Sequence, residues 1–214
     1  MSAVNTAARK ITKRGAKKLA LSSLMLAAAG GVASQGAFAT FTSTATGGPQ
    51  TIASGTVTIA LGATGASTNR LNINASGLAA GDTVSRSVDL INSGSLNLAS
   101  ITLTTTASPS SALDTNTANG LQMAIYRCTS AWTEAGSNPA FTYTCGGTTS
   151  TVLASTPVIG AAMALSNLTA TTAGNTDHLE VVLTLPGAAP NALEGLTSTI
   201  SYAFTGTQRA AQAD

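Results

Sequence analysis

Short runs of alternating apolar and polar residues recur along residues 54–206, separated by turns rich in Gly, Asn and Pro. A period of two is typical of strands with one buried face, and Thr and Val favour strands. About eight to nine strands at this spacing predict an all-β fold, an antiparallel β-sandwich of jelly-roll type. The clearest runs span residues 54–61, 70–76, 82–92, 96–106, 121–128, 140–145, 178–185 and 195–206.

Three irregularities refine this pattern. Arg86 interrupts the apolar face of the run over residues 82–92, which predicts that part of this strand lies at an edge or rim. The apolar phase shifts by one residue between Leu98 and Ile101, as a β-bulge would produce. Residues 156–168 fit either a strand or a short helical turn.

The first 39 residues have the three parts of a secretion signal. Six of the ten basic residues lie in the first 18 positions, and the small-residue site Ala37-Phe38-Ala39 ends the segment. The apolar stretch between them has about fourteen residues, too few to span a bilayer comfortably, although a retained anchor helix is the alternative. Cleavage after Ala39 predicts a secreted chain that begins at Thr40.

Charge is sparse and unevenly placed. Residues 40–214 contain four arginines and eight acidic residues, a net charge of −4, and they contain no lysine. A mildly acidic surface argues against nucleic-acid binding, which needs clustered cations, and against binding to anionic lipid. We therefore expect no nucleic-acid partner and no membrane contact after cleavage. Without lysine, lysine-linked bonds between subunits are excluded, so any assembly is non-covalent.

The two cysteines, Cys128 and Cys145, both lie in the part predicted to be secreted. An oxidising destination favours a disulfide between them, which would pin the base of a hairpin-like excursion around Trp132. Aromatic residues gather around this excursion, and they form either a ligand platform or a packing surface for the hairpin. Their strand phase favours packing. These residues are Tyr126, Trp132, Phe141 and Tyr143.

Two blocks stand out, "TIASGTVTIAL" with the stretch before it and "GLAAGDTVSRSVDLINSGSLNLASITL". Together they resemble the TasA/camelysin family of secreted bacterial proteins. "ATFTSTAT" followed by "TIASGTVTIAL" is similar to the family's aromatic-containing start and its "FASGTLDL" block. "GLAAGDTVSRSVDLINSGSLNLASITL", over residues 77–103, is similar to the family's "LxPGDxVxxxxxxxNxGSLxI" stretch. The segment with the two cysteines and the end "GLTSTISYAFTGTQ" resemble actinobacterial-type relatives. One departure is Thr42-Ser43, which stands where the family usually has an acidic residue after the first aromatic one.

The resemblance implies a SipW-type signal peptide, removed by a dedicated signal peptidase, and donor-strand assembly into extracellular fibres. The new N-terminus would add as a strand to the next copy of the chain, with Phe41 as its anchor. The break at residues 47–49 would act as a hinge. The alternative is that this segment pairs within its own sandwich or stays flexible. The donor strand would consist of Thr40, Phe41, Thr42, Ser43, Thr44, Ala45 and Thr46.

The camelysin name also implies a metallopeptidase, which the residues do not favour. A zincin needs two histidines one helical turn apart and a glutamate, whereas this chain has one histidine, His178. His178 and Glu180 share a strand face opposite Asp177, which leaves a two-ligand site or a solvated strand start as alternatives. No catalytic triad or phosphate-binding loop is evident. We therefore predict no catalytic, cofactor-binding or metal-binding residues.

These observations predict a domain order and a function. A signal peptide (1–39) precedes the donor strand and hinge (40–49), the β-sandwich (50–207) and a polar tail (208–214). We expect a secreted, non-enzymatic subunit of biofilm-matrix fibres that lies in the extracellular matrix or at the cell surface. Its partners would be copies of itself and other matrix proteins. The alternatives are a monomeric cell-surface or adhesion module and a camelysin-like metallopeptidase.

Overall fold

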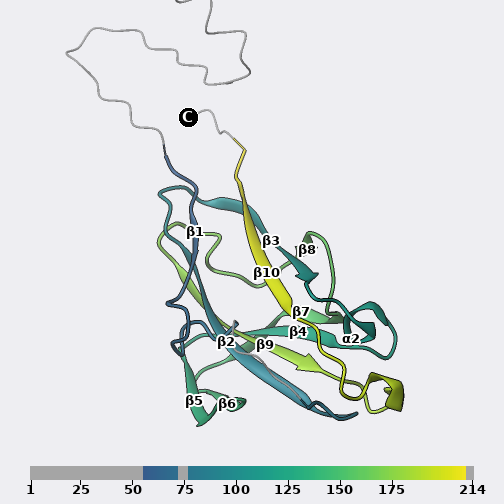
Figure 1. The fold of residues 1–214 in the computed structure, drawn as a ribbon. Coiled ribbons are helices and arrows are strands. Elements are labelled where there is room, and N and C mark those ends of the chain that lie inside the picture. The colour runs from purple at the N-terminus through teal and green to yellow at the C-terminus, as the bar shows by residue number, and fades with distance from the viewer. Residues whose placement is uncertain (1–54, 72–76, 211–214) are drawn as a thin grey trace, which may run out of the picture. The chain divides into compact units, whose positions relative to one another are not determined.

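Two antiparallel sheets face each other in the computed structural model, which describes residues 55–71 and 77–210 (Figure 1). The larger sheet has five strands in the order β1-β2-β9-β4-β7, and the smaller sheet has three in the order β10-β3-β8. Strands β5 and β6 form a separate hairpin. The bounds are β1 Ile59–Leu61, β2 Thr83–Asn92, β3 Leu98–Ala107, β4 Gln122–Cys128, β5 Trp132–Ser137, β6 Ala140–Cys145, β7 Thr149–Pro157, β8 Met163–Ala164, β9 Thr176–Thr184 and β10 Ile200–Gln208.

This arrangement confirms the predicted all-β antiparallel sandwich, while the jelly-roll connectivity stays a prediction. The described residues also contain two short helical segments that the sequence pattern did not predict, α2 (Ala112–Thr115) and the 3-10 helix η1 (Asn191–Leu193). Within the described part of the chain, no helix is long and apolar enough to cross a membrane.

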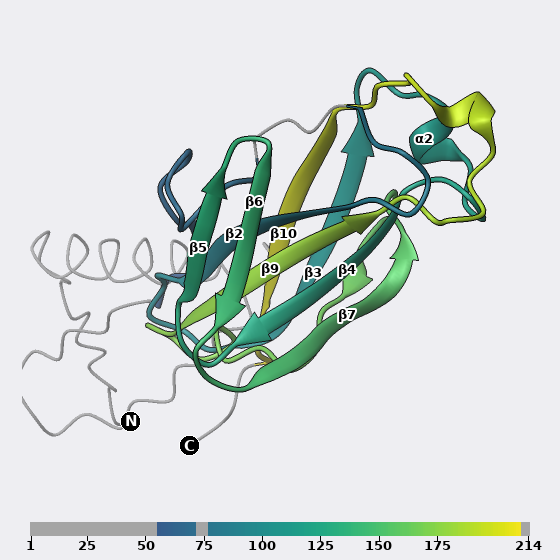
Figure 2. The ribbon, with the colours of Figure 1, turned by 90° about the horizontal axis from the view of Figure 1, so that it is seen from below.

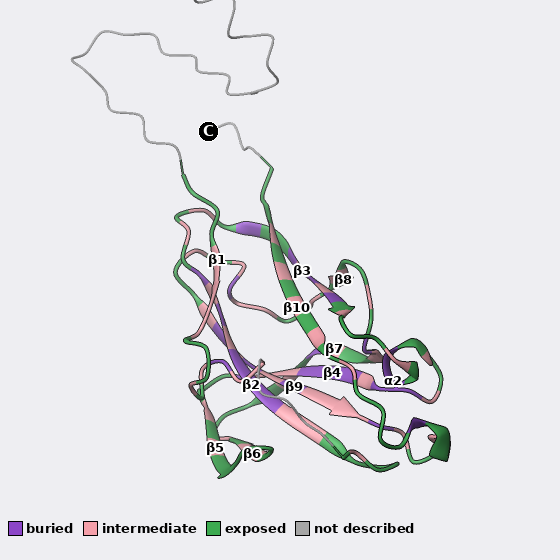
Figure 3. Ribbon diagram, viewed as in Figure 1, coloured by how far each residue is buried: buried purple, intermediate pink, exposed green. Residues whose placement is uncertain are grey.

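The core lies between the two sheets and uses one face of each central strand. In β9, and in β2 from Val88 to Asn92, alternate residues are buried as the period-two pattern predicts, and Figure 3 shows the buried stretches of β2 and β4. Burying one large apolar side chain contributes roughly 1.5–3 kcal/mol. The largest contributions to the core come from Val88, Leu90, Ile101, Leu103, Met123, Ile125, Leu179 and Val181.

The predicted bulge in β3 is confirmed. Thr207 of β10 pairs with Ser100 and Gln208 pairs with Leu98, so Ala99 has no partner of its own in the ladder. Because one extra residue reverses the side-chain alternation, Leu98 and Ile101 can both face the core.

The strand predicted over residues 54–61 is wrong in its first half, since only Ile59–Leu61 pairs with β2. Val57 was expected to face the core but is 38% exposed. The cause is a competing set of backbone hydrogen bonds, in which Thr56 and Thr58 accept from the turn at residues 93–96 instead of from a strand.

Other boundaries also differ from the sequence pattern. Arg70 and Leu71 are not in a strand, and the rest of that predicted run lies outside the described residues. The run at 195–206 becomes a strand only at Ile200, and Leu196 is exposed. Strand β7 was not predicted, and the ambiguous segment 156–168 contains the two-residue strand β8.

The part of β2 that contains Arg86 extends beyond β1, so it lies at an edge of the sheet as predicted. Its side chain is nevertheless buried, with 5% exposure. Asp177, at the start of β9, is buried as well, so the solvated strand start considered for this position is wrong.

Asp177 connects the start of β9 to the loop before it. Its carboxylate accepts hydrogen bonds from the backbone N–H groups of Thr169 and Ala170 at 2.7–3.0 Å and from the Thr169 hydroxyl at 2.6 Å. Arg127 of β4 lies 2.8 Å from the same carboxylate. A fully buried charge is thereby matched by a cation and several N–H and O–H donors, as a stable buried ion requires.

Replacing Asp177 is expected to be strongly destabilising. Asp177→Asn removes the negative charge and leaves Arg127 without its carboxylate, so the free energy of unfolding should fall by about 3–5 kcal/mol. Guanidinium unfolding would measure the loss. Glu194→Gln, an exposed acid-to-amide change, serves as the control and should shift stability by less than about 0.5 kcal/mol. Equal stability of the two variants would contradict the role given to Asp177.

Candidate functional site

The residues predicted for cleavage and strand donation lie outside the described residues. They are Ala37, Ala39 and Thr40 for cleavage and Thr40–Thr46 for the donor strand. The predicted disulfide is present: Cys128 and Cys145 are bonded, with 5.7 Å between their Cα atoms. Because the donor residues are outside the described part of the chain, only the surface that would accept a donor strand can be described.

No described strand pairs with the outer edge of β10, although β1 packs against β10 at Gly206. β10 pairs with β3 and lies at the end of the sheet order. In an antiparallel ladder, residues alternately direct their backbone groups to the partner and away from it. Thr199 exchanges backbone hydrogen bonds with Ser108 and Pro109 across this pair. The N–H and C=O groups that face the open side therefore belong to Ile200, Tyr202, Phe204 and Gly206.

The side chains of Ile200, Tyr202 and Phe204 pack against the core, and Figure 3 shows intermediate and exposed residues alternating along β10. Burial raises the pKa of Tyr202 to about 12, so its phenol stays neutral. A Cβ on Gly206 would lie 2.9 Å from side-chain atoms of Ile59 and Leu98, so only glycine allows β1 to pack this closely. Facing outward are Ser201, Ala203, Thr205 and Thr207, all exposed and uncharged.

The opposite edge of the sandwich, β7, differs from β10. The carbonyl of Val152 accepts a hydrogen bond from Ser166 at 3.0 Å, and the carbonyl of Thr151 accepts one from the Asn167 side chain at 2.7 Å. β7 also ends at Pro157, which cannot donate to an added strand. β10, "ISYAFTGTQ", contains no proline and no charge, the two features that commonly protect an edge.

The β5–β6 hairpin packs against β2 of the larger sheet (Figure 2). Trp132 donates its indole N–H to the carbonyl oxygen of His178 at 3.0 Å, and the disulfide closes the base of the hairpin. The half-buried Phe141 and Tyr143 share one face of β6. Among the alternatives for the aromatic residues, the packing role is therefore confirmed.

Two arginines from outside the hairpin hold it in place. Arg70 donates to the Glu134 carboxylate at 2.5 and 2.8 Å, and Tyr143 donates to the same group at 3.0 Å. The guanidinium carbons of Arg70 and Arg86 lie 4.8 and 5.6 Å from the centre of the Phe141 ring, within cation–π distance. The hydrogen bond from Arg70 is the main cause that lowers the pKa of Glu134.

His178 and Glu180 share one face of β9 as predicted, and Asp177 lies on the other. The His178 Nδ1 atom is 2.7 Å from a carboxylate oxygen of Asp89 on β2. Burial raises the pKa of Glu180, while a hydrogen bond with Ser85 opposes this rise. His178 and Glu180 thus have separate partners within the sheet.

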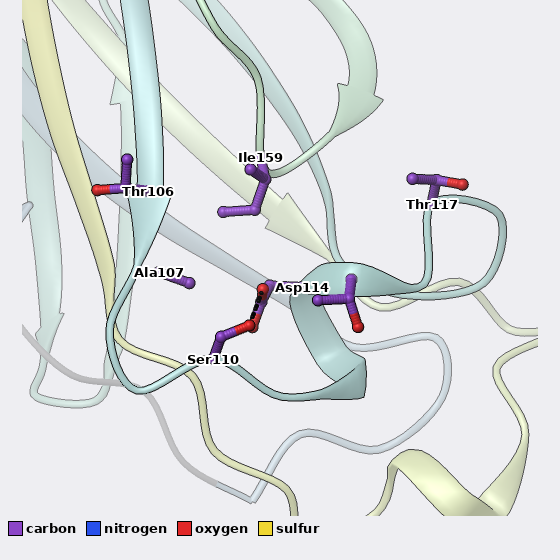
Figure 4. Close-up of a pocket in the computed structure, with 7 residues that line it drawn as sticks. Thr106, Ala107, Ser110, Asp114, Thr117 and Ile159 are labelled. Carbon is purple, nitrogen blue, oxygen red and sulfur yellow. Dashed lines mark hydrogen bonds between the residues drawn. The ribbon is translucent and has the colours of Figure 1, made fainter.

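A groove of about 460 Å³ opens between the end of β3 and α2 (Figure 4). Its wall combines Thr and Ser hydroxyls with the apolar side chain of Ile159. Asp114 accepts hydrogen bonds from the Ser110 and Ser198 hydroxyls and from the Ser111 N–H at 2.6–2.7 Å. Burial alone would raise the pKa of Asp114, but these hydrogen bonds lower it. The carboxylate is thus used to cap α2.

Sequence reasoning missed three of these features. The Arg70–Glu134 pair joins residues 64 positions apart, and no local pattern indicates it. Asp177 was only placed on the strand face opposite His178 and Glu180, although it holds a loop. Arg86 did leave a signal, because it is the charged residue on an otherwise apolar strand face. This interruption predicted the edge of the sheet, but it gave no indication of the hairpin that contacts Arg86.

Comparison with known proteins gives one result for nearly the whole chain. A sequence model of the camelysin metallo-endopeptidase family matches residues 12–213. No curated protein matches the chain.

The family description implies a peptidase metal, and the donor groups of this chain do not fit one. Every His, Cys, Asp and Glu except Asp214 lies in the described part of the chain. Within residues 55–71 and 77–210, no three such side chains are grouped so that they could hold an ion. Both cysteines form the disulfide, and the single histidine is paired with Asp89. No catalytic step through a metal is therefore derived.

Hairpin docking is expected to weaken in acid. The folded-state pKa of Glu134 lies below its ordinary value of 4.5, so its contribution is complete above that value and is lost as the pH falls through the folded-state pKa. The fluorescence of Trp132, the single tryptophan, should change over this range. Glu134→Gln should abolish the transition, whereas Glu194→Gln should retain it. A transition unaltered by Glu134→Gln would disprove the assignment.

Proposed function

The chain belongs to the camelysin metallo-endopeptidase family, and we propose that it is a secreted, non-catalytic subunit of extracellular fibres. Assembly is non-covalent, and the N-terminal strand of one copy adds to a sheet edge of the next. The observation that carries this proposal is the outer edge of β10, which is nine residues long, uncharged and unpaired by any strand in the described part of the chain. The matrix or the cell surface is the proposed location.

Both the edge of β10 and the proposed donor strand have backbone and side-chain properties that suit strand addition. The acceptor offers main-chain N–H and C=O groups at every second residue, and an added strand satisfies them. The proposed donor, Thr40–Thr46, has β-favouring threonines and carries no charge. Phe41, Ser43 and Ala45 would share one strand face, with Phe41 as the only large apolar group. Backbone pairing supplies the affinity, and Phe41 sets the register.

The arrangement of titratable groups supports a structural role. Glu134, Asp177 and Asp89 each pair with a basic or histidine side chain. Asp114 caps a helix, and the cysteines form a disulfide. A catalytic acid, base or nucleophile must lie within hydrogen-bond reach of a substrate. Here Glu134 holds the hairpin, Asp177 holds a loop and Asp114 caps α2.

The assembly proposal predicts that two distant changes have the same effect. The chain cleaved after Ala39 should form fibres visible by negative-stain microscopy, and Phe41→Asp should leave it a folded monomer. Ala203→Lys should do likewise, because a lysine on an edge strand opposes strand addition. Ala154→Lys, the same change at an exposed position of β7, is the control and should form fibres.

Fibres that persist with Phe41→Asp would refute the donor-strand role. Fibres lost with Phe41→Asp but kept with Ala203→Lys would move the acceptor away from β10. A monomeric wild-type chain on size-exclusion chromatography would favour the alternative of a cell-surface or adhesion module.

The non-catalytic assignment has its own test. Purified protein incubated with casein should release no peptides, with or without a divalent-metal chelator, because the donor groups of the described residues do not assemble a metal centre. Cleavage that a chelator inhibits, and that His178→Ala removes, would establish the peptidase activity in the family description.

A further inference from the structure

The groove between the end of β3 and α2 brings one carboxylate, four hydroxyls and two apolar side chains together in a volume of about 460 Å³. Figure 4 shows Ala107, Ser110, Asp114 and Ile159 directed toward the same space. The side chains that line the groove include no Arg, Lys, His, Asn, Gln or Trp. None of them carries an N–H group, so a ligand that binds them must supply most of the hydrogen-bond donors.

Two of the hydroxyls have already used their hydrogens within the protein. Ser110 donates to Oδ1 of Asp114 at 2.7 Å, and Thr115 donates to the carbonyl oxygen of Ser111 at 3.0 Å. A hydroxyl has one hydrogen but two acceptor lone pairs. Toward a ligand, Ser110 and Thr115 can therefore act only as acceptors. Together with the Asp114 carboxylate, they make this part of the groove wall a set of three acceptor groups.

Asp114 differs from the other bonded carboxylates because it has no basic partner. Glu134, Asp177 and Asp89 each pair with an arginine or histidine, whereas no ion pair within residues 55–71 and 77–210 involves Asp114. Burial raises the pKa of Asp114, but its hydrogen bonds outweigh burial and lower the pKa, so the group is ionised at neutral pH. A cation in the groove would supply the opposite charge that this largely buried carboxylate lacks.

The apolar part of the groove adds a second requirement. Ile159 is 37% exposed, and with Ala107 it offers a surface for a hydrocarbon segment of a ligand. A primary alkylammonium group combines such a segment with three N–H donors, which matches the three acceptor groups of the wall. A phosphate or sulfate would be repelled by Asp114 and would find no cation among the lining residues.

We propose that this groove binds a primary alkylammonium group, with the ammonium at Asp114, Ser110 and Thr115 and the methylene stem against Ile159. Two sources have this chemistry, a lysine side chain of another protein and a free linear amine. Residues 40–214 contain no lysine, so their own side chains cannot fill the groove in this way. No residue of β10 lines the groove, and the proposal goes beyond the proposed function: it holds whether or not the chain forms fibres.

Equilibrium dialysis of the chain cleaved after Ala39 against labelled pentylamine tests the proposal, and it applies to monomers and fibres alike. Pentylamine should bind saturably at a single site per chain. Pentanol, its neutral counterpart, should bind at least about tenfold more weakly, because its hydrogen bond to Asp114 is not assisted by charge. Equal affinity for the two probes, or no saturable binding of pentylamine, would overturn the proposal.

Asp114→Asn locates the bound ammonium. The amide keeps an oxygen that can accept from Ser111 but has no charge, so pentylamine binding should weaken at least about tenfold. Glu194→Gln, the same acid-to-amide change outside the groove, should bind pentylamine as the parent does. An equal loss in both variants would assign binding to the net charge of the chain and contradict a site at Asp114.

A second pair of variants probes the groove without altering Asp114. Ile159→Lys places a tethered ammonium in the groove and should abolish pentylamine binding, whereas Ile159→Met should retain it. The position is exposed, so both variants should fold. This pair decides the question if Asp114→Asn shows no cooperative thermal unfolding. Pentylamine binding that is unchanged by Ile159→Lys would disprove the site.

A blocked tripeptide with a central lysine distinguishes the two sources of the ammonium. If the tripeptide binds more tightly than pentylamine, the ligand is a lysine side chain of another protein, and the peptide backbone adds contacts with the groove. If pentylamine binds more tightly, the ligand is a free amine. Either result supports the alkylammonium site, provided that Asp114→Asn weakens binding of the same probe.

Discussion

The ladder between β2 and β9 is the interaction on which the rest of this structure depends. Nine consecutive residue pairs join the two strands. One face of the ladder supplies Val88, Leu90, Leu179 and Val181 to the core. The ladder also holds Asp89 beside His178 and presents the His178 carbonyl to Trp132. Arg86, near the start of β2, bonds to the β5–β6 hairpin. The core and the position of the hairpin both depend on this one pairing.

Three of the arginines have specific structural roles. Arg70, Arg86 and Arg127 each reach a group far away in the sequence, namely Glu134, Pro139 and Asp177. The Arg127–Asp177 ion pair, for example, restrains the loop at Thr169 and Ala170. The small Ser, Thr and Ala side chains that dominate the chain offer few such contacts. The surface left over is rich in hydroxyls and carries little charge. Contacts with other molecules then rest on backbone groups and shape more than on electrostatic attraction.

Three edges of the sandwich differ in which groups bond to them. The edge of β7 is partly bonded by the Ser166–Asn167 segment, Arg86 at the start of β2 bonds to the hairpin, and β10 pairs with no described strand on its outer side. A β-sandwich that must stay monomeric protects all its long edges. Membership of the camelysin family does not by itself decide between a peptidase and a fibre subunit. The proposed subunit role rests on the difference between these edges.

The sequence alone determined the elements whose cause is local. Period-two patterns predicted β2, β4, β6 and β9, and the phase shift before Ile101 predicted the bulge at Ala99, because side-chain alternation is a property of each strand by itself. The number and context of the cysteines predicted the disulfide.

Tertiary structure decided the features that depend on residues far apart in the chain. Val57 is not in a strand, because the residues on either side of it accept hydrogen bonds from the turn at residues 93–96. Arg86 became buried because a hairpin more than fifty positions away covers it. β7 is a strand because β4 pairs with it, although its own pattern is weak. The openness of β10 is likewise a property of the assembled sheet: which strand lies beside an edge depends on the packing of the whole chain, and a local alternation pattern carries no information about it.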